Sequence, residues 1–323
     1  MPSELFSGLV VAAHGRHYQV MLADGSELRC YSRGKKSDVV CGDRVEGQKQ
    51  GQDVGVIESI LPRRNLFYRS NVARQKLIAA NVDLVLLVVA VMPAFSGELI
   101  ERCRVAARQQ NMDCLILLNK CDLADGLPAA RKQLYRLAHE GCEIMEISAR
   151  NAIETTAKLT PMLRGKVSLL AGQSGMGKST LINALVPNAR AATGTVSLAL
   201  ASGKHTTTAA RLYFLPPAKE TLAAGNEGGA LIDSPGLQAF GLAHLAFAEL
   251  EAAFPEFQPY LGYCRFRDCR HQQEPGCALA QAAEKGAFSP ERLLIFRALS
   301  ESIRFATPAT SALRGRRSPI VQS

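Results

Sequence analysis

Residues 167–181 read "VSLLAGQSGMGKSTL". An apolar run is followed by the pattern G-x-x-x-x-G-K-[ST] and then by a helical pattern, which predicts a strand, a phosphate-binding loop and a helix. The glycines let backbone N–H groups curl around phosphates at a helix N-terminus, where anions are favoured. Lys178 is expected to reach the β- and γ-phosphates, and the Ser179 hydroxyl to ligate Mg²⁺. The residues predicted to surround the phosphates are Gly172, Gln173, Ser174, Gly175, Met176, Gly177, Lys178, Ser179 and Thr180.

Apolar runs alternate with helical patterns on both sides of this loop, from about residue 80 to 240. The apolar runs are "VDLVLLVVAV", "CLILLNK", "CEIMEIS", "KVSLLAG", "ARLYFLP" and "GALIDSP". The helical segments between the early runs are "GELIERCRVAARQQN", "LPAARKQLYRLAHEG" and "TAKLTPMLRG". This alternation predicts a mostly parallel sheet with helices on both faces.

Two short motifs upstream of the loop indicate that the bound base is guanine. In "NKCD" (119–122), Asp122 can accept hydrogen bonds from N1–H and the 2-amino group of guanine, a pair of donors that adenine lacks. Asn119 can reach the opposite base edge, and the Lys120 stem can pack along the nucleotide. "ISAR" (147–150) is the expected companion, with a backbone N–H near Ala149 meeting guanine O6; Arg150 replaces the usual lysine. The predicted base site comprises Asn119, Lys120, Cys121, Asp122, Ser148 and Ala149.

Two further motifs downstream have the pattern of nucleotide-sensing switches. "DSPG" (233–236) ends an apolar run; Asp233 is expected to hold Mg²⁺ through water and the Gly236 N–H to sense the γ-phosphate. "GKHTTTAARL" (203–212) lies where the first switch belongs, and one threonine of 206–208, taken here as Thr207, is expected to ligate Mg²⁺.

The residue after "DSPG" is Leu237, where Ras-like enzymes carry a water-orienting glutamine. Intrinsic hydrolysis is therefore expected to be slow, and another group must position the attacking water. His205 is a candidate, and a partner molecule could supply the group instead.

The motif order is base reader, companion, phosphate loop, first switch and second switch, which is a circular permutation of the usual GTPase order. Permutation preserves a sheet when the original termini lie close together. Its consequence is that the second switch leads directly into the C-terminal region.

Residues 1–65 show short runs of period two separated by turn signals, which predicts a small β-barrel. An OB-type barrel of this size, with several arginines and lysines, commonly binds RNA. An SH3-like adaptor barrel is the alternative. "RNLFYRSN" (64–71) is interpreted as a linker into the GTPase domain, residues 66–240.

Residues 241–323 combine helical patterns, a Cys/His cluster and a basic tail. "CRFRDCRHQQEPGC" (264–277) gathers three thiols and one imidazole, a closed tetrahedral set suited to one structural Zn²⁺. The four predicted ligands are Cys264, Cys269, His271 and Cys277. Ten Lys/Arg against six Asp/Glu over residues 255–323 suggest that this module touches RNA.

Composition narrows the class of protein. The 323 residues are 47% hydrophobic and 21% charged, as in a soluble globular protein of two or three domains. The net charge of +9 favours a nucleic-acid partner, although a solvated basic face explains it equally well. The longest apolar run, residues 84–92, is far short of the ~20 residues needed to cross a bilayer. No secretory signal is recognisable, and scattered cysteines suit a reducing cytosol.

With these motifs in place, the chain closely resembles the bacterial ribosome small subunit-dependent GTPase A family. The resemblance spans nearly the whole chain and is most specific in the order "NKCD", "GQSGMGKST", "HTTT", "DSPG" and in "CRFRDCRHQQEPGC". It implies a cytoplasmic GTPase that binds 16S rRNA and the 30S subunit late in maturation, and that hydrolyses GTP to GDP and phosphate when the ribosome stimulates it. It also implies Zn²⁺ and Mg²⁺, no membrane partner, and a monomer. The alternative is a nucleotide-gated RNA-binding assembly or stress factor in which turnover is incidental.

Overall fold

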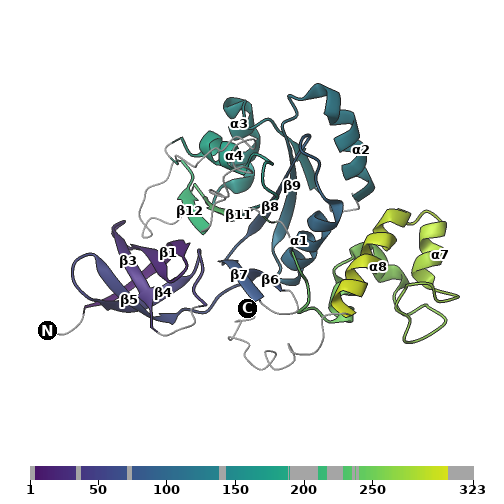
Figure 1. Cartoon of the computed structure of the whole chain (residues 1–323), viewed down its shortest axis with the longest axis horizontal. Coiled ribbons are helices and arrows are strands. Elements are labelled where there is room, and N and C mark those ends of the chain that lie inside the picture. The colour runs from purple at the N-terminus through teal and green to yellow at the C-terminus, as the bar shows by residue number, and fades with distance from the viewer. Residues whose placement is uncertain are drawn as a thin grey trace, which may run out of the picture.

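The structure is a computed structural model that describes residues 4–33, 38–70, 75–137, 143–187, 189, 210–216, 228–234, 237 and 240–304. Figure 1 shows a barrel at the N-terminal side, a central α/β region and a helical C-terminal region. The strands are β1 (Leu5–His14), β2 (His17–Leu22), β3 (Glu27–Ser32), β4 (Arg44–Lys49), β5 (Val54–Ile60), β6 (Leu66–Ser70), β7 (Gln75–Ala80), β8 (Leu84–Ala90), β9 (Asp113–Asn119), β10 (Glu143–Glu146), β11 (Val167–Ala171), β12 (Ala210–Phe214) and β13 (Ala230–Asp233).

The helices flank the later strands. They are α1 (Gly97–Gln109), α2 (Leu127–Leu137), α3 (Ala152–Leu163), α4 (Lys178–Leu185), α6 (Phe247–Ala252), α7 (Ala278–Glu284) and α8 (Pro290–Arg304), with short 3₁₀ turns η1 (Ala124–Gly126) and η3 (Pro255–Tyr260). No described helix is both long enough and apolar enough to span a membrane.

The first five strands form a closed barrel in the order β1-β2-β3-β5-β4, with β4 returning to pair with β1. β3 and β5 run parallel, and the other barrel pairings are antiparallel. Alternate side chains of these strands point inward, so that Val10, Val20, Leu28 and Val45 pack in the barrel core. This is the OB-type barrel predicted from the period of two.

The central sheet has the strand order β10-β9-β8-β11-β13-β12. The first five of these strands are parallel, and β12 is antiparallel to β13. β8 reads Leu-Val-Leu-Leu-Val-Val-Ala and is buried along its whole length, as expected for a strand covered by helices on both faces. The phosphate-loop strand β11 lies beside β8, the first strand of the region, which is the arrangement that a circular permutation produces.

The barrel and the central sheet are hydrogen-bonded into one eleven-stranded sheet through β1 and β12. Ala12 pairs with Arg211, and Ala13 with Ala210. The predicted first switch, residues 203–212, continues into β12. The strand next to this switch is therefore also the one that pairs with the barrel.

The interpretation of residues 64–71 as a linker was wrong. β6 and β7 form an antiparallel hairpin whose Phe67 is 1% exposed and packs against Phe240 with ring centroids 5.3 Å apart. Burial of this aromatic ring drives the segment into regular structure. The hairpin also holds the chain that follows the second switch, because the Ser70 N–H donates to the Gly241 carbonyl and the Ala243 N–H to the Ser70 carbonyl.

The C-terminal region packs α6, η3, α7 and α8 around aromatic side chains. Phe254, Phe257 and Phe296 are fully buried, and their ring centroids lie 5.0–5.3 Å apart. Figure 1 shows α8 beside α1, so this helical region docks on one flank of the central region.

Candidate functional site

The phosphate loop connects β11 to α4 and is shaped by glycine. Gly175 and Gly177 have φ angles of 81° and 92°, in the left-handed region that side chains disfavour. A Cβ on Gly177 would lie 2.4 Å from the Asn119 amide nitrogen. The Lys178 ammonium donates to the carbonyls of Gly172 and Gln173 at 2.8 and 2.9 Å, which holds it over the loop. Met176 is buried; Ser179 and Thr180 begin α4 and are half-buried.

Asn119 joins three segments that are far apart in the sequence. Its amide nitrogen donates to the Met176 carbonyl in the phosphate loop at 2.9 Å. Its amide oxygen accepts from the N–H groups of Lys120 at 2.8 Å and of Ala149, in the "ISAR" segment, at 2.9 Å. The side chain is 1% exposed, and these three bonds use one of its two N–H donors and its carbonyl oxygen.

Lys120 makes a second connection between the base reader and the phosphate loop. Its ammonium donates to the carbonyls of Gly175 and Met92, each at 2.8 Å. Burial lowers the pKa of Lys120, and the nearby Arg150 lowers it further. Its backbone has a φ of 62°, a conformation that turns the chain sharply after β9.

Asp122 is held ready as an acceptor. The Ser148 hydroxyl donates to one carboxylate oxygen at 2.7 Å, and Arg150 lies 3.8 Å from the other. The pKa of Asp122 is lowered chiefly by the Ser148 hydrogen bond, with a smaller contribution from the charge of Arg150. The carboxylate is thus ionised and faces solvent. The neighbouring Cys121 thiol donates to the Leu118 carbonyl at 3.1 Å.

Asp233 ends β13 beside the phosphate loop and is 5% exposed. Burial raises its pKa to about 6, against the opposing effect of the Lys178 charge; burial also lowers the pKa of Lys178. Leu237 is buried, and its N–H donates to the Gly172 carbonyl at 3.0 Å. The apolar side chain that replaces a glutamine is therefore packed into the protein.

Several predicted site residues lie outside the described residues. They are His205, Thr206, Thr207, Thr208 and Gly236, together with the basic tail after residue 304. Their predicted roles remain predictions.

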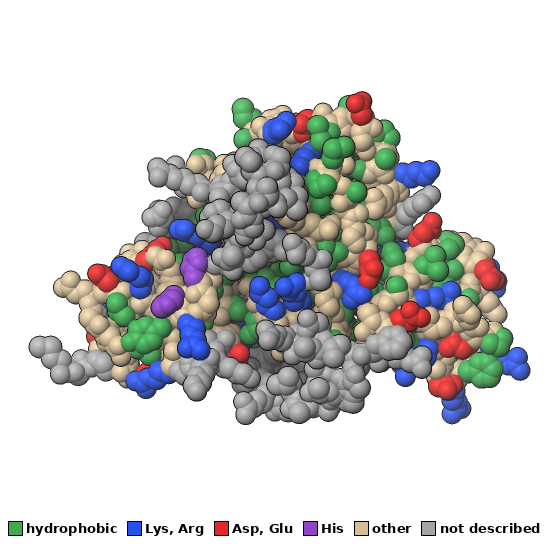
Figure 2. Space-filling view, in the orientation of Figure 1, with side chains coloured by type: hydrophobic (Ala, Val, Ile, Leu, Met, Phe, Trp, Pro, Cys, Tyr) green, Lys and Arg blue, Asp and Glu red, His purple; other side chains and the backbone are tan. Residues whose placement is uncertain are grey.

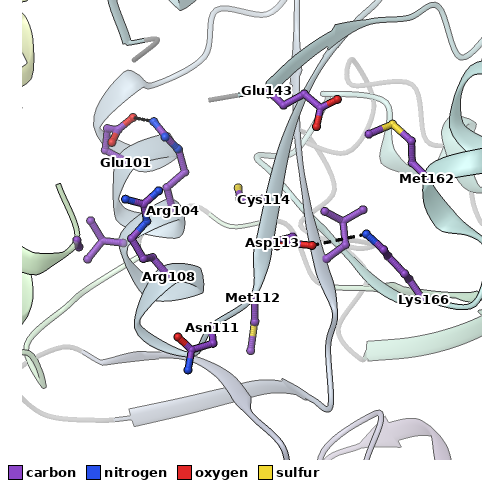
Figure 3. A pocket seen from close by; sticks show the side chains of 13 residues that line it. Glu101, Arg104, Arg108, Asn111, Met112, Asp113, Cys114, Glu143, Met162 and Lys166 are labelled. Atoms are coloured by element: carbon purple, nitrogen blue, oxygen red, sulfur yellow. Dashed lines mark hydrogen bonds and ion pairs between the residues drawn. The ribbon is translucent and has the colours of Figure 1, made fainter. Parts of the chain in front are cut away.

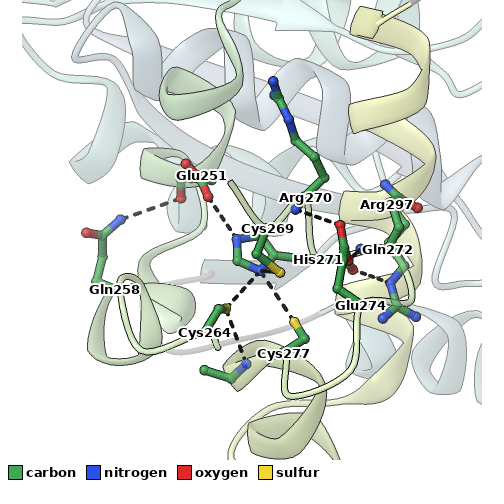
Figure 4. A network of polar contacts seen from close by, with 11 residues as sticks. Glu251, Gln258, Cys264, Cys269, Arg270, His271, Gln272, Glu274, Cys277 and Arg297 are labelled. Atoms are coloured by element: carbon green, nitrogen blue, oxygen red, sulfur yellow. Dashed lines mark hydrogen bonds and ion pairs between the residues drawn. The ribbon is translucent and has the colours of Figure 1, made fainter. Parts of the chain in front are cut away.

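The four predicted metal ligands converge in the C-terminal region (Figure 4). Their ligand atoms all lie within 4.8 Å of one another. The His271 Nδ1 is 3.5, 3.6 and 3.4 Å from the Sγ atoms of Cys264, Cys269 and Cys277. A tetrahedral zinc ion would separate sulfur and nitrogen ligands by about 3.6 Å, so the three nitrogen–sulfur distances suit this ion.

A carboxylate outside this set orients the imidazole. The His271 Nε2 lies 2.9 Å from Glu251, which leaves Nδ1 as the atom turned toward the thiols (Figure 4). Burial raises the pKa of the Cys269 thiol to about 12 and also raises that of Cys277. A bound cation is what would hold such buried sulfurs as thiolates.

The sequence pattern of the RsgA GTPase family matches residues 60–243. The chain belongs to the RsgA GTPase family. Two similar proteins are named small ribosomal subunit biogenesis GTPase RsgA. The one from Bordetella pertussis is 47% identical over 95% of this chain and 100% of its own length. The one from Burkholderia pseudomallei is 48% identical over 92% of each chain. As an RsgA-family protein, the chain is a GTP-hydrolysing enzyme.

Solved structures agree with this membership of the RsgA family. YjeQ from Thermotoga maritima superimposes with a TM-score of 0.68 and 29% identity, covering 94% of this chain and 99% of that one. YloQ, described as a circularly permuted GTPase, gives a TM-score of 0.64 at 24% identity over 94% and 97% of the two chains, and it shows the fold alone. The fold and its permuted order are those predicted from the motifs.

Some residues that contact the candidate site residues carried no local signal in the sequence. Glu251 lies 20 residues before His271, and Met92 contributes only a backbone carbonyl. Helical spacing on α6 could have placed Glu251 on the face toward the cluster, but nothing marked it as the partner.

One cavity among the described residues is separate from both sites. Its volume is about 630 Å³, and its lining includes Leu84 and Asp113, the first residues of β8 and β9. Figure 3 shows the side chains that surround it. Asp113 and Lys166 form an ion pair of 3.5 Å on its wall. Because nucleotides bind beyond the carboxyl ends of parallel strands, this cavity is no part of the nucleotide site.

Proposed function

We propose that the protein binds and hydrolyses GTP in support of late maturation of the 30S ribosomal subunit. The observation that carries the proposal is the position of Asn119. Its side chain brings together the phosphate loop, the base reader and the "ISAR" segment, which the sequence separates by 57 and 30 residues. A guanine nucleotide requires all three segments at one place.

In this proposal, some of the described residues contact the guanine base and others contact the phosphates. Asp122 accepts from the guanine edge, a backbone N–H near Ala149 faces O6, and the Lys120 stem covers the base. The backbone N–H groups of residues 172–180 surround the phosphates, with Gln173, Ser174 and Thr180 contributing main-chain or hydroxyl groups. Lys178 then exchanges the carbonyls that it contacts in this structure for phosphate oxygens.

Mg²⁺ fits the same end of the site. Ser179, Thr207 and Asp233 provide the oxygen donors that this ion prefers, and the ion supplies charge neutralisation at the phosphates when bound. Gly236 would sense the γ-phosphate through its N–H. Buried Leu237 offers no hydrogen bond to water, so His205 or a group from the partner positions the attacking water.

The proposed partners are the 30S subunit and its 16S rRNA. The named relatives are small-subunit biogenesis GTPases, and the net charge of +9 suits RNA. On the face shown in Figure 2, lysines and arginines are spread over the barrel, the central region and the C-terminal region rather than gathered in one patch. This distribution supports contact by the barrel and the C-terminal module together.

We also propose the domain bounds, the bound metal, the oligomeric state and the location of the protein. The domains are residues 1–65, 66–240 and 241–323, and one structural zinc ion is held by the Cys/His cluster. The protein acts as a monomer in the cytoplasm.

The test is GTP turnover by the purified protein alone, with 30S subunits and with 50S subunits. We expect a large increase with 30S only, because the buried Leu237 supplies no hydrogen bond to the attacking water and the partner is proposed to complete the site. Tight 30S binding without stimulation would replace this proposal with that of a nucleotide-gated assembly factor.

The base assignment has its own test in Asp122→Asn. The amide presents a donor where the carboxylate only accepts, so preference should move from guanine to xanthine nucleotides. Competition between GDP and XDP for the two proteins measures this preference. Retained guanine preference would remove Asp122 from the base site.

A further inference from the structure

Helix α1 contacts the phosphate loop at its N-terminal end. The N–H of its N-cap residue Ser96 donates to the Gln173 side-chain oxygen at 3.2 Å. The Ser96 hydroxyl accepts from the Leu99 N–H at 3.2 Å, which fixes the first turn. Any displacement of the phosphate loop that moves Gln173 therefore acts directly on the start of this helix.

The middle of α1 is joined to the C-terminal region by a buried ionic network. Arg292 of α8 lies 2.6 Å from Glu101 of α1 and 2.6 Å from Glu256 of η3. Its guanidinium also stacks over Phe254, 4.8 Å from the ring centre. Arg104 contacts the second oxygen of Glu101 at 2.7 Å, as Figure 3 shows.

The charged side chains of this network are buried. Side chains of Glu101 and Arg292 are 2% and 1% exposed. One Glu256 oxygen and the Arg292 NH1 atom lack a well-aligned hydrogen bond to any described residue. Removal of one partner from a buried ion pair leaves an uncompensated charge and is strongly destabilising. The charges of this network therefore hold the elements that carry them together. Here those elements are α1, α8 and η3.

Two further contacts extend the connection along the helix. Arg102 donates to the Phe240 carbonyl at 3.4 Å, just after the second switch, and Gln109 donates to the Glu249 carbonyl at 2.6 Å. The helix is therefore attached to the phosphate loop at its beginning and to the C-terminal region at its middle, through Glu101, and at its end, through Gln109. α1 is one continuous helix of thirteen residues, so these contacts lie on a single element.

We propose that α1 couples the phosphate loop to the C-terminal region, with Gln173 and Arg292 as positioning residues for the GTPase reaction at its two contacts. This inference rests on the proposed assignment of residues 172–180 to phosphate binding. The coupling runs through α1 and is separate from the covalent path that leads from the second switch. Arg292 touches no nucleotide, and its effect reaches the site through Glu101, α1 and Ser96.

The experiment is a double-mutant cycle between Gln173→Ala and Arg292→Met in the full-length protein. Dissociation constants for GDP and for a fluorescent non-hydrolysable GTP analogue are measured, together with kcat and KM for GTP. We expect Arg292→Met to weaken analogue binding at least about threefold in the parent and to have almost no effect in Gln173→Ala, since coupled residues are non-additive. Arg292→Lys, which keeps the charge, should restore part of the loss.

Arg63→Met is the matched control. Partly buried Arg63 pairs with buried Asp43 of the barrel at 2.7 Å, but neither residue contacts α1 among the described residues. We expect this variant to lower the melting temperature without changing nucleotide affinity. The same result for Arg292→Met, or independent multiplicative effects in the cycle, would overturn the coupling.

A further variant separates failure of the coupling from failure of the site. Lys178→Ala should abolish nucleotide binding if residues 172–180 hold phosphate. If it does so while the cycle is multiplicative, only the role of α1 is wrong. If Lys178→Ala binds nucleotide normally, the site assignment itself fails. Should Arg292→Met not fold, the cycle is run with Glu101→Gln, which removes one charge at constant shape.

Discussion

Gly177 shows how little space separates the phosphate loop from the base reader. Its φ of 92° and the 2.4 Å that would separate an added Cβ atom from the Asn119 amide nitrogen act together. Gly177→Ala must either push Asn119 away from Met176 and Ala149 or distort the loop. We expect GDP affinity to fall more than about a hundredfold, because several hydrogen bonds of about 1 kcal/mol are lost with the loop geometry. Calorimetric titration with GDP measures the change.

The control for this prediction is Gly165→Ala. Gly165 has a φ of 70°, but no atom lies within 4 Å of a Cβ placed on it. The substitution therefore adds only the left-handed strain of about 1–2 kcal/mol, which should lower the melting temperature and leave GDP affinity unchanged. Equal effects of the two substitutions on GDP binding would show that strain alone matters at Gly177.

Asn119 also shows that a sequence motif does not predict all the hydrogen-bond partners of its residues. The sequence indicated that this residue approaches the base edge, because that is what the "NKCD" pattern does. The structure gives its amide three partners within the protein, at the carbonyl of Met176 and the N–H groups of Lys120 and Ala149. Local spacing predicts which residues assemble, but the partner of a buried amide depends on segments that meet only in the fold.

At the scale of elements, the β6–β7 hairpin explains why a strand was missed. β8 and β11 were recognisable because their continuous apolar runs are buried on both faces. β6 reads Leu-Phe-Tyr-Arg-Ser, a short run flanked by arginines, and its strand pairing depends on β7 and on residues 241–243. An element whose partners are distant in sequence has no local period strong enough to reveal it.

Tyr68 of the same hairpin contacts His244, which lies in an environment that disfavours the protonated form of its imidazole. The His244 ring lies 4.4 Å from the Tyr68 ring, and its Nδ1 has no hydrogen-bond partner among the described residues. Burial lowers its pKa from 6.5 to about 4, although Glu249 opposes the shift. Between these two values the unfolded chain binds a proton that the folded protein does not, so stability falls as pH decreases.

His244→Phe should remove this acid sensitivity while keeping the ring contact with Tyr68. The parent is expected to lose up to about 1.4 kcal/mol per pH unit from this group as pH falls from 6.5 toward 4. Urea unfolding at about pH 7.5 and about pH 5.5, on either side of the unfolded pKa, compares the two proteins. The exposed His17→Phe serves as the control; if it flattens the pH dependence as much as His244→Phe, the assignment is wrong.

At the scale of the whole molecule, the order of the motifs along the chain predicted the fold more specifically than the presence of each motif. The order of "NKCD", the phosphate loop and "DSPG" indicated a permuted GTPase, and the strand order confirms it. What the order could not predict is how the three regions attach. The β1–β12 pairing and the buried contact between Arg292 and Glu101 join residues about 200 positions apart, and such contacts follow from surface complementarity rather than from any repeating pattern.

The Cys/His cluster contacts the C-terminal region through more than its four predicted ligand atoms. The His271 ring stacks on Phe247 and lies near Phe296, and the His271 carbonyl accepts from Arg297 of α8 at 2.6 Å. One ligand thus contacts both α6 and α8. If zinc fixes this imidazole, its loss should loosen the packing of these helices.

Glu251→Gln tests this organisation without removing a ligand. The amide cannot supply the negative charge that stabilises the zinc-bound imidazole, so zinc affinity should fall about 10–100-fold. Competition with a chelating dye measures the affinity, and circular dichroism during chelation follows the helices. Exposed Glu284→Gln on α7 is the control and should retain zinc like the parent. Unchanged zinc affinity in Glu251→Gln would mean that the 2.9 Å contact to His271 only packs the helix and does not tune the metal site.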